Sequence, residues 1–100
     1  MPLFSVEYTY PVEFADGRDT TRPDHRAWLS KLNSEGVVRM AGPYADGSGA
    51  LILLDCADEQ AAKDILAADP FAVAGYVGEV RINKWAVSYT HLTLPTIYSV

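Results

Sequence analysis

The chain has 100 residues, with 13 Asp and Glu against 8 Lys and Arg, so its formal net charge is −5, and 49% of its residues are hydrophobic. This composition indicates one compact, mildly acidic domain, and the lack of a Lys/Arg-rich run argues against a nucleic-acid or membrane partner. Its longest apolar runs fall far short of the roughly 20 residues of a membrane-spanning helix, and because no secretory signal is visible we expect a cytoplasmic protein.

Apolar and polar residues alternate over residues 4–10, which predicts a first strand with one apolar face. A turn is expected at residues 15–17, where Ala, Asp and Gly follow one another. Residues 21–24 resemble a capping box with a proline in the first turn, which predicts a helix over about residues 23–34. Gly36 is expected to end that helix as its C-cap residue.

A second strand is expected over residues 37–41, ending at Gly42 and Pro43. The glycine-rich loop that follows leads into the unbroken apolar run of residues 50–54, which is typical of a strand covered on both faces. These two strands are therefore predicted to form a hairpin.

Asp58 is a candidate cap for a second helix, which must end before Pro70 because the residue preceding a proline disfavours the α conformation. The last strand is expected over about residues 77–85. This order of strands and helices predicts an α+β fold, a ferredoxin-like βαββαβ antiparallel sheet with both helices on one face. Because the other face needs a cover, we expect a homodimer or a higher homo-oligomer.

Residues 87–100 contain no Asp, Glu, Lys or Arg, unlike the chain before them. The run over residues 87–96 resembles the conceptual translation of a sequencing adapter. We therefore expect a domain over residues 1–86 and an artefactual tail over residues 87–100, and His91 is not a candidate site residue. The alternative is that the tail forms a real extra strand.

His25 shares one stripe of the predicted first helix with Trp28 and Leu32, so it is expected to face the sheet. A histidine on an apolar stripe is more often a core residue than a catalytic one. Asp69 is expected at the C-terminal end of the second helix, where a carboxylate costs about 0.3 to 1 kcal/mol unless a cation is close. Either His25 is its partner or Asp69 and Pro70 simply end the helix.

Three separated segments carry a family resemblance. They are Arg-Pro-Asp-His at residues 22–25, Met-Ala-Gly-Pro-Tyr at residues 40–44, and Ala-Ala-Asp-Pro-Phe-Ala-Val-Ala-Gly at residues 67–75. Over about residues 3–86 the chain resembles the YciI-like (YCII-related) proteins. The resemblance implies a dimeric α+β barrel in which each subunit has a cleft with a histidine and an aspartate as a catalytic pair.

Carried over residue by residue, this pair is His25 and Asp69. The resemblance also implies that Arg22, Gly42, Pro43, Ser48 and Phe71 line or shape the cleft. Tyr44 and Phe71 are in addition candidates for the apolar walls of a site for an aromatic ligand. Arg22 at a helix start suits a carboxylate or enolate oxygen. The alternatives are a solvated arginine, loop flexibility for Ser48, and core packing for the two aromatic residues.

The resemblance implies a cofactor-free enzyme of the lyase, dehydrochlorinase or isomerase type that moves a proton on a small aromatic or carbonyl compound. One characterised type in the family eliminates chloride from a chlorinated hydroxyquinol. No metal-ligand spacing and no glycine-rich phosphate loop are visible, so neither a metal nor a nucleotide cofactor is expected. The alternative is a non-catalytic dimeric module that binds a small ligand or a partner domain in the same cleft.

Overall fold

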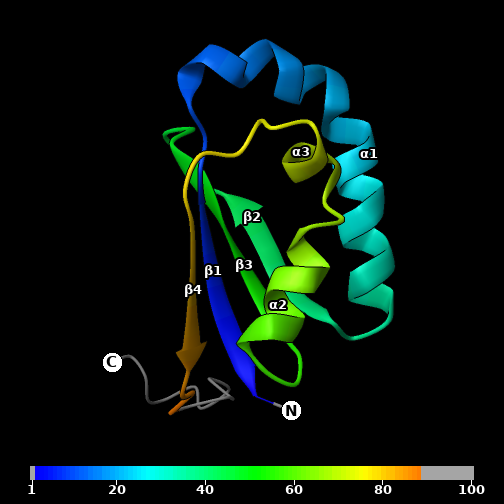
Figure 1. Ribbon diagram of the computed structural model, residues 1–100, viewed down its shortest axis with the longest axis vertical. Helices are drawn as coiled ribbons and strands as arrows, with labels where there is room; N and C mark the ends of the chain where they lie inside the picture. The colour runs from blue at the N-terminus through cyan, green and yellow to red at the C-terminus, as the bar shows by residue number, and fades with distance from the viewer. Residues whose placement is uncertain (1, 89–100) are drawn as a thin grey trace, which may run out of the picture.

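The computed structural model describes residues 2–88, in which four strands form one antiparallel sheet in the order β2-β3-β1-β4, with the helices on one face (Figure 1). The elements in chain order are β1 (Leu3–Thr9), the 3-10 helix η1 (Val12–Phe14), α1 (Ala15–Ser34), β2 (Val38–Pro43), β3 (Gly49–Asp55), α2 (Glu59–Leu66), α3 (Pro70–Val73) and β4 (Val80–Trp85). This topology confirms the predicted ferredoxin-like α+β fold. Within residues 2–88, no helix is long and apolar enough to cross a membrane.

The core lies between the sheet and the helices, because alternate side chains of the two central strands point to that side. Val6 and Tyr8 of β1 are buried there beside Ile52 and Leu54 of β3, and the register pairs Val6 with Ile52. Leu66 of α2 packs onto the same cluster. Burial of each aliphatic side chain contributes about 1.5 to 3 kcal/mol, so a register slip that turned this face outward would be strongly disfavoured.

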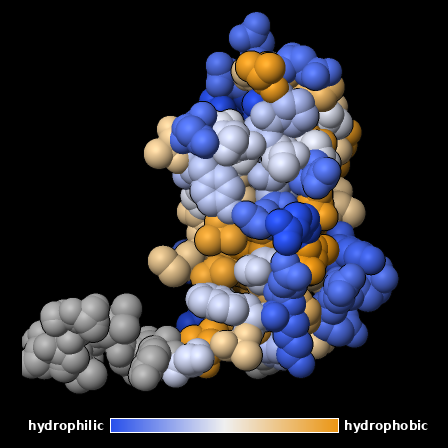
Figure 2. All heavy atoms as spheres, turned by 90° about the vertical axis from the view of Figure 1, so that its left-hand side faces the viewer, coloured by the Kyte–Doolittle hydropathy of each residue, from blue (hydrophilic) through white to orange (hydrophobic). Residues whose placement is uncertain are grey.

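The opposite face of the sheet is open in this single chain. Leu51 of β3, Met40 of β2 and Trp85 of β4 are 38%, 68% and 47% exposed. Apolar side chains gather in the lower half of this face (Figure 2). The expectation that β3 is covered on both faces is therefore not met within one copy of the chain.

The first helix begins earlier than predicted. α1 starts at Ala15, so the residues expected to form a turn at 15–17 are its first turn, and Pro23 lies inside the helix rather than at its start. A proline in a helix interior removes one hydrogen bond and costs about 3 kcal/mol. The capping pattern around Pro23 was therefore misleading, and contacts made by the first turns must offset this cost.

Arg18, in the first part of α1, supplies such contacts. Its side chain is buried, and Nη1 donates hydrogen bonds to the carbonyl oxygens of Pro11 and Tyr76 at 2.9 and 3.1 Å. These bonds tie the beginning of α1 to the segment before it and to the loop before β4. Both carbonyl groups lie outside the helix. The start of α1 therefore depends on tertiary contacts, which outweigh the local capping pattern around Pro23.

Asp58 and Asp69 both cap helices, and only the first was predicted to do so. Asp58 accepts a hydrogen bond from the backbone N–H of Ala61 at 2.8 Å, as expected for the start of α2. α2 ends at Leu66, and Asp69 begins α3 by accepting from the backbone N–H of Phe71. The expected unfavourable position against a helix C-terminus is therefore wrong: Asp69 is an N-cap residue.

Two strand boundaries also differ from the predictions. β2 continues through Gly42 to Pro43, which is tolerated because β2 is an edge strand and the missing N–H of a proline faces away from the sheet. β4 begins at Val80 rather than at residue 77. Residues 89–100, which include most of the adapter-like run, lie outside the described residues.

Candidate active site

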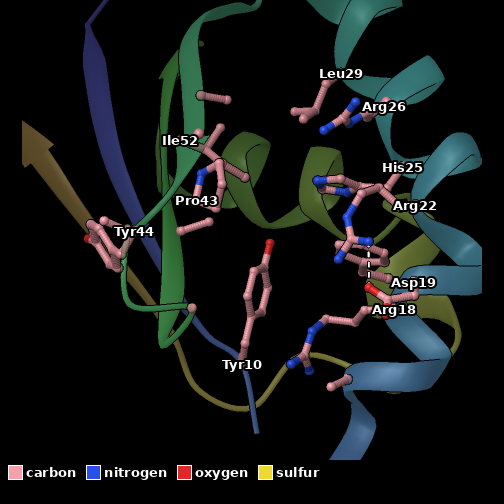
Figure 3. A pocket seen from close by; sticks show the side chains of 17 residues that line it. Tyr10, Arg18, Asp19, Arg22, His25, Arg26, Leu29, Pro43, Tyr44 and Ile52 are labelled. Carbon is pink, nitrogen blue, oxygen red and sulfur yellow. Dashed lines mark hydrogen bonds and ion pairs between the residues drawn. The ribbon is translucent and has the colours of Figure 1, made fainter. Parts of the chain in front are cut away.

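One face of α1 lines a cavity of about 690 Å³ that opens between this helix and the β2–β3 hairpin (Figure 3). The size is that of a pocket for a small ligand. His25, Arg22 and Arg26 point into it from α1, and Pro43 and Ile52 lie on the opposite wall.

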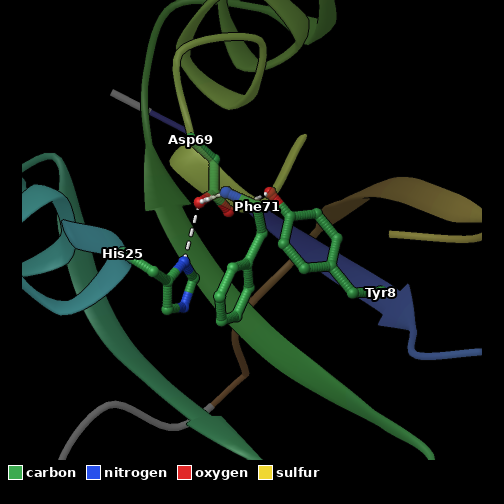
Figure 4. Close-up of polar contacts among 4 residues, drawn as sticks. All are labelled: Tyr8, His25, Asp69 and Phe71. Carbon is green, nitrogen blue, oxygen red and sulfur yellow. Dashed lines mark hydrogen bonds and ion pairs between the residues drawn. The ribbon is translucent and has the colours of Figure 1, made fainter. Parts of the chain in front are cut away.

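His25 and Asp69 form the polar centre of this site (Figure 4). His25 Nδ1 lies 2.7 Å from Asp69 Oδ1, and Asp69 is fully buried. The hydroxyl of Tyr8 donates to Asp69 Oδ2 at 2.8 Å, and the backbone N–H of Phe71 donates to Oδ1 at 3.0 Å. Because both carboxylate oxygens already accept hydrogen bonds, we expect His25 to donate its Nδ1 proton to Asp69, which places the lone pair of a neutral ring on Nε2.

The Phe71 ring packs against the face of the His25 imidazole. The rings of His25 and Phe71 are stacked, with centroids 4.0 Å apart and planes only 6° from parallel. The same residue supplies the backbone N–H that orients Asp69, so α3 fixes both members of the pair. The imidazole is thus oriented by a hydrogen bond at its edge and by an aromatic ring on its face.

The other ring nitrogen of His25 is open to the cavity. Nε2 has no hydrogen-bond partner within residues 2–88. The atom itself is not buried, although the residue as a whole is only 8% exposed. Figure 3 shows the ring pointing into the cavity from α1. The nitrogen that could act on a ligand is therefore the one that Asp69 leaves free.

Tyr10 adds a hydroxyl to the cavity, and its ring lies under the guanidinium of Arg18, with Cζ 4.5 Å from the ring centroid. Burial, followed by the nearby Asp69 carboxylate, raises the pKa of Tyr10 to about 12. The same two causes raise the pKa of Tyr8 far above its usual range. Both phenols therefore stay protonated near neutral pH, so each can donate a hydrogen bond.

The structure brings most of the predicted cleft residues together. Arg22, Gly42, Pro43 and Phe71 line the cavity, as does His25. Asp69 lies behind the histidine, where it touches the ring rather than the open space.

Two predicted cleft residues are placed differently. Ser48 is not part of the cavity lining. Its backbone N–H donates to the Asp46 side chain, and its carbonyl oxygen accepts from the backbone N–H of Tyr10. Tyr44 lies at the rim, and its ring points away from His25 (Figure 3), with the hydroxyl donating to Glu7 at 2.7 Å. The position of Ser48 favours a role in the loop over substrate binding. Little of the Tyr44 ring faces the cavity.

Sequence reasoning missed four residues of the site: Tyr8, Tyr10, Arg18 and Arg26. The two tyrosines lie in the alternating pattern of the first strand, which predicts where their rings pack but not what their hydroxyls contact. A signal for the arginines was present, since residues 18, 22 and 26 are spaced by four along the chain. It was hidden because the helix was expected to start only at Pro23.

Within residues 2–88, no group of three or more His, Cys, Asp or Glu side chains is arranged to hold a metal ion. What the residues of the site can offer is acid–base chemistry by His25 and hydrogen-bond donation by the arginines and Tyr10.

The fold and the site together define an α+β protein of ferredoxin-like topology with a buried aspartate behind a cavity histidine. The chain belongs to the YCII-related domain family, whose profile matches residues 3–86. The matched range ends where the adapter-like run begins. The chain is also 30% identical over 61 residues to the uncharacterized protein YjpA of Bacillus subtilis (strain 168). The aligned region covers 61% of this chain and 71% of that protein.

A solved structure shares the fold. It is the 5-chloro-2-hydroxyhydroquinone dehydrochlorinase TftG from Burkholderia phenoliruptrix AC1100, in complex with 2,5-dihydroxybenzoquinone. The match has a TM-score of 0.74 at 18% sequence identity, and it covers 84% of this chain and 93% of that one. At this level of identity the likeness shows the fold of the chain.

Proposed function

We propose that the cavity is the active site of a small-molecule enzyme of the lyase or isomerase type, in which His25 moves a proton on an aromatic or carbonyl compound. The observation that carries this proposal is the 2.7 Å contact between His25 Nδ1 and the fully buried Asp69, with Nε2 left open to the cavity. The dehydrochlorinase that shares the fold, solved with a quinone bound, supports a small cyclic compound as substrate.

In the proposed reaction, Nε2 of neutral His25 takes a proton from an acidic C–H or O–H of the substrate. The imidazolium that forms is stabilised by Asp69, which accepts the Nδ1–H throughout. The electron pair left on the substrate moves toward an oxygen. In a lyase it then expels a leaving group from a neighbouring carbon, and in an isomerase the proton returns from Nε2 to a different atom.

The negative charge on the substrate oxygen needs donors that are already in place. Arg22 and the protonated hydroxyl of Tyr10 both face the cavity and are suited to this role. A positioned base typically contributes about 10²- to 10⁴-fold in rate, so these groups must supply the remaining stabilisation and orient the substrate.

The test is proton exchange in D₂O, followed by NMR on a panel of hydroxyquinols, hydroxyquinones and 1,3-dicarbonyl compounds. For any compound whose exchange or elimination the protein accelerates, we expect His25→Gln to lower the rate at least about 100-fold. The matched control is His91→Gln, which changes the only other histidine of the chain and is expected to leave the rate unchanged. A compound that binds without any His25-dependent exchange would instead favour a non-catalytic binding module.

A second copy of the chain is proposed to cover the open face of the sheet, which would complete a dimeric α+β barrel. Leu51 and Met40 are exposed on that face, and apolar side chains gather there (Figure 2). Glu7, which pairs with Leu51 in the β1–β3 register, forms an ion pair with Arg81. An exposed apolar sheet face is unfavourable in a monomer, and contact with the same face of a second copy would remove its apolar residues from water.

Leu51→Glu is expected to convert a dimer into a monomer, because it replaces an apolar side chain of the proposed interface with a second negative charge beside Glu7. Sedimentation equilibrium measures this directly, since the chain mass is 10.9 kDa. Val12→Glu is the control, because Val12 is 86% exposed and lies in η1, away from the sheet. A wild-type protein that sediments as a monomer, or a Leu51→Glu variant that remains dimeric, would contradict this arrangement.

A further inference from the structure

Three arginines of α1 give the cavity a charge opposite to that of the whole chain. Arg18, Arg22 and Arg26 follow one another at intervals of four residues, so they lie along one face of the helix. All three line the cavity, and of the described residues that line it, Asp19 is the only acidic one. Three positive charges against one negative charge leave the lining at +2, while the chain as a whole carries −5.

The three guanidinium groups differ in how far they are already engaged. Arg18 is buried, donates to two backbone carbonyls and stacks on Tyr10, so it is a structural residue. Arg22 pairs with Asp19 at 2.6 Å on the surface, with its side chain 39% exposed. Arg26 makes no hydrogen bond or ion pair within residues 2–88. Arg26 and the remaining donors of Arg22 are therefore free to bind a ligand.

The wall opposite the arginines is apolar. Ala41 and Pro43 of β2 and Ala50 and Ile52 of β3 form it, and none of them carries a polar side chain. Figure 3 shows Pro43 and Ile52 facing the helix across the cavity, with His25 between Arg26 and Arg22 on the other side. The cavity thus has one apolar side and one cationic side, with the imidazole on the cationic side.

We infer that the substrate is a planar ring compound that carries a carboxylate. Its ring lies against the β2–β3 wall, and its carboxylate binds Arg22 and Arg26. A guanidinium presents parallel N–H donors that match the two oxygens of a carboxylate. The position of His25 beside the two arginines then sets the reacting atom close to the carboxylate. This inference rests on the proposed function only in taking the cavity as the active site.

The experiment measures binding rather than turnover. Salicylate, its uncharged amide salicylamide, and acetate are titrated into ¹⁵N-labelled protein and followed by amide NMR shifts. We expect salicylate to bind about tenfold more tightly than either of the other two probes, which lack the charge or the ring. Arg26→Gln and Arg22→Gln are each expected to weaken salicylate about fivefold or more, without weakening salicylamide.

Arg81→Gln is the matched control, because it removes the same charge from the open face of the sheet, where Arg81 pairs with Glu7. It is expected to leave salicylate affinity unchanged. If Arg81→Gln weakened salicylate binding equally, the effect would come from the overall charge of the protein, and the inference would be overturned. Equal affinity for salicylamide or acetate, or the absence of saturable salicylate binding, would also overturn it.

His25→Gln separates the inference from the proposed function. In a His25→Gln background, Arg26→Gln is expected to weaken salicylate binding about fivefold or more, as it does in the wild type, because the arginines and the apolar wall do not depend on His25. If binding depends on the arginines but no compound shows His25-dependent proton exchange, the proposed enzyme activity fails and the carboxylate site stands. If exchange depends on His25 but uncharged compounds bind as well as salicylate, the carboxylate site fails alone.

Discussion

Asp69→Ala is expected to lower the free energy of unfolding by about 3 to 5 kcal/mol, because each buried donor that loses its acceptor costs about 1 to 3 kcal/mol. Asp69 is fully buried and accepts from the Tyr8 hydroxyl, the Phe71 N–H and His25. Water cannot reach the vacated position freely, so these donors remain without partners. Urea denaturation followed by tryptophan fluorescence gives the value.

Asp58→Ala is the matched control, since Asp58 is also an aspartate that caps a helix, but at an exposed position. Its loss is expected to cost only about 1 kcal/mol. Asp69→Asn should fall between the two, because the amide keeps one acceptor oxygen while it turns an NH₂ group toward a donor. A cost for Asp69→Ala that is no larger than that for Asp58→Ala would show that the three hydrogen bonds do not hold the fold together.

Gly49→Ala is expected to destabilise the protein by about 1 to 3 kcal/mol, as a steric overlap in a packed region does. Gly49 is the first residue of β3 and pairs with Thr9 of β1. A Cβ atom at this position would overlap the backbone carbonyl oxygen of Tyr8, which is fixed in the central strand. The strands would have to separate, and Tyr8 would shift away from Asp69.

Gly42→Ala is the control for this change, because it adds the same methyl group to the neighbouring strand β2. Nothing in the described residues lies within 4 Å of a Cβ built at Gly42, and its φ is not positive. At a protein concentration where the chain is a monomer, its free energy of unfolding is expected to stay within about 0.5 kcal/mol of the wild-type value, as for most uncrowded surface changes. Thermal unfolding of the two variants side by side measures the difference, and equal values would contradict the steric argument.

The sheet could be predicted because its signals are local. The alternation around Val6 defines a strand whose predicted buried face is correct. The apolar run around Ile52 defines a second strand but does not show which of its faces the helices cover. The early start of α1 could not be predicted, since it depends on Arg18 reaching carbonyls at Pro11 and Tyr76, one of which is far away in the sequence.

The candidate site was predictable in its members more than in its geometry. His25 and Asp69 came from the family resemblance and from a helix stripe, and the structure places them in contact. Asp69 was expected at the C-terminal end of a helix, and that placement was wrong. It is the N-cap residue of α3, a four-residue helix whose sequence pattern is too short to be recognised. Tyr8 was missed because alternation along a strand predicts a buried ring but says nothing about the partner of its hydroxyl.

The hydrogen bonds of Asp69 join parts of the chain that are far apart: 61 residues separate it from Tyr8, and 44 separate it from His25. No helix or hairpin can form these contacts alone, so they exist only when β1, α1 and α3 have docked together. A compact state that kept its helices but loosened its side-chain packing would lose them. The environment of the His25 ring is therefore a probe of tertiary order in this protein, and its NMR signals would distinguish the native state from a molten globule even where circular dichroism in the far ultraviolet does not.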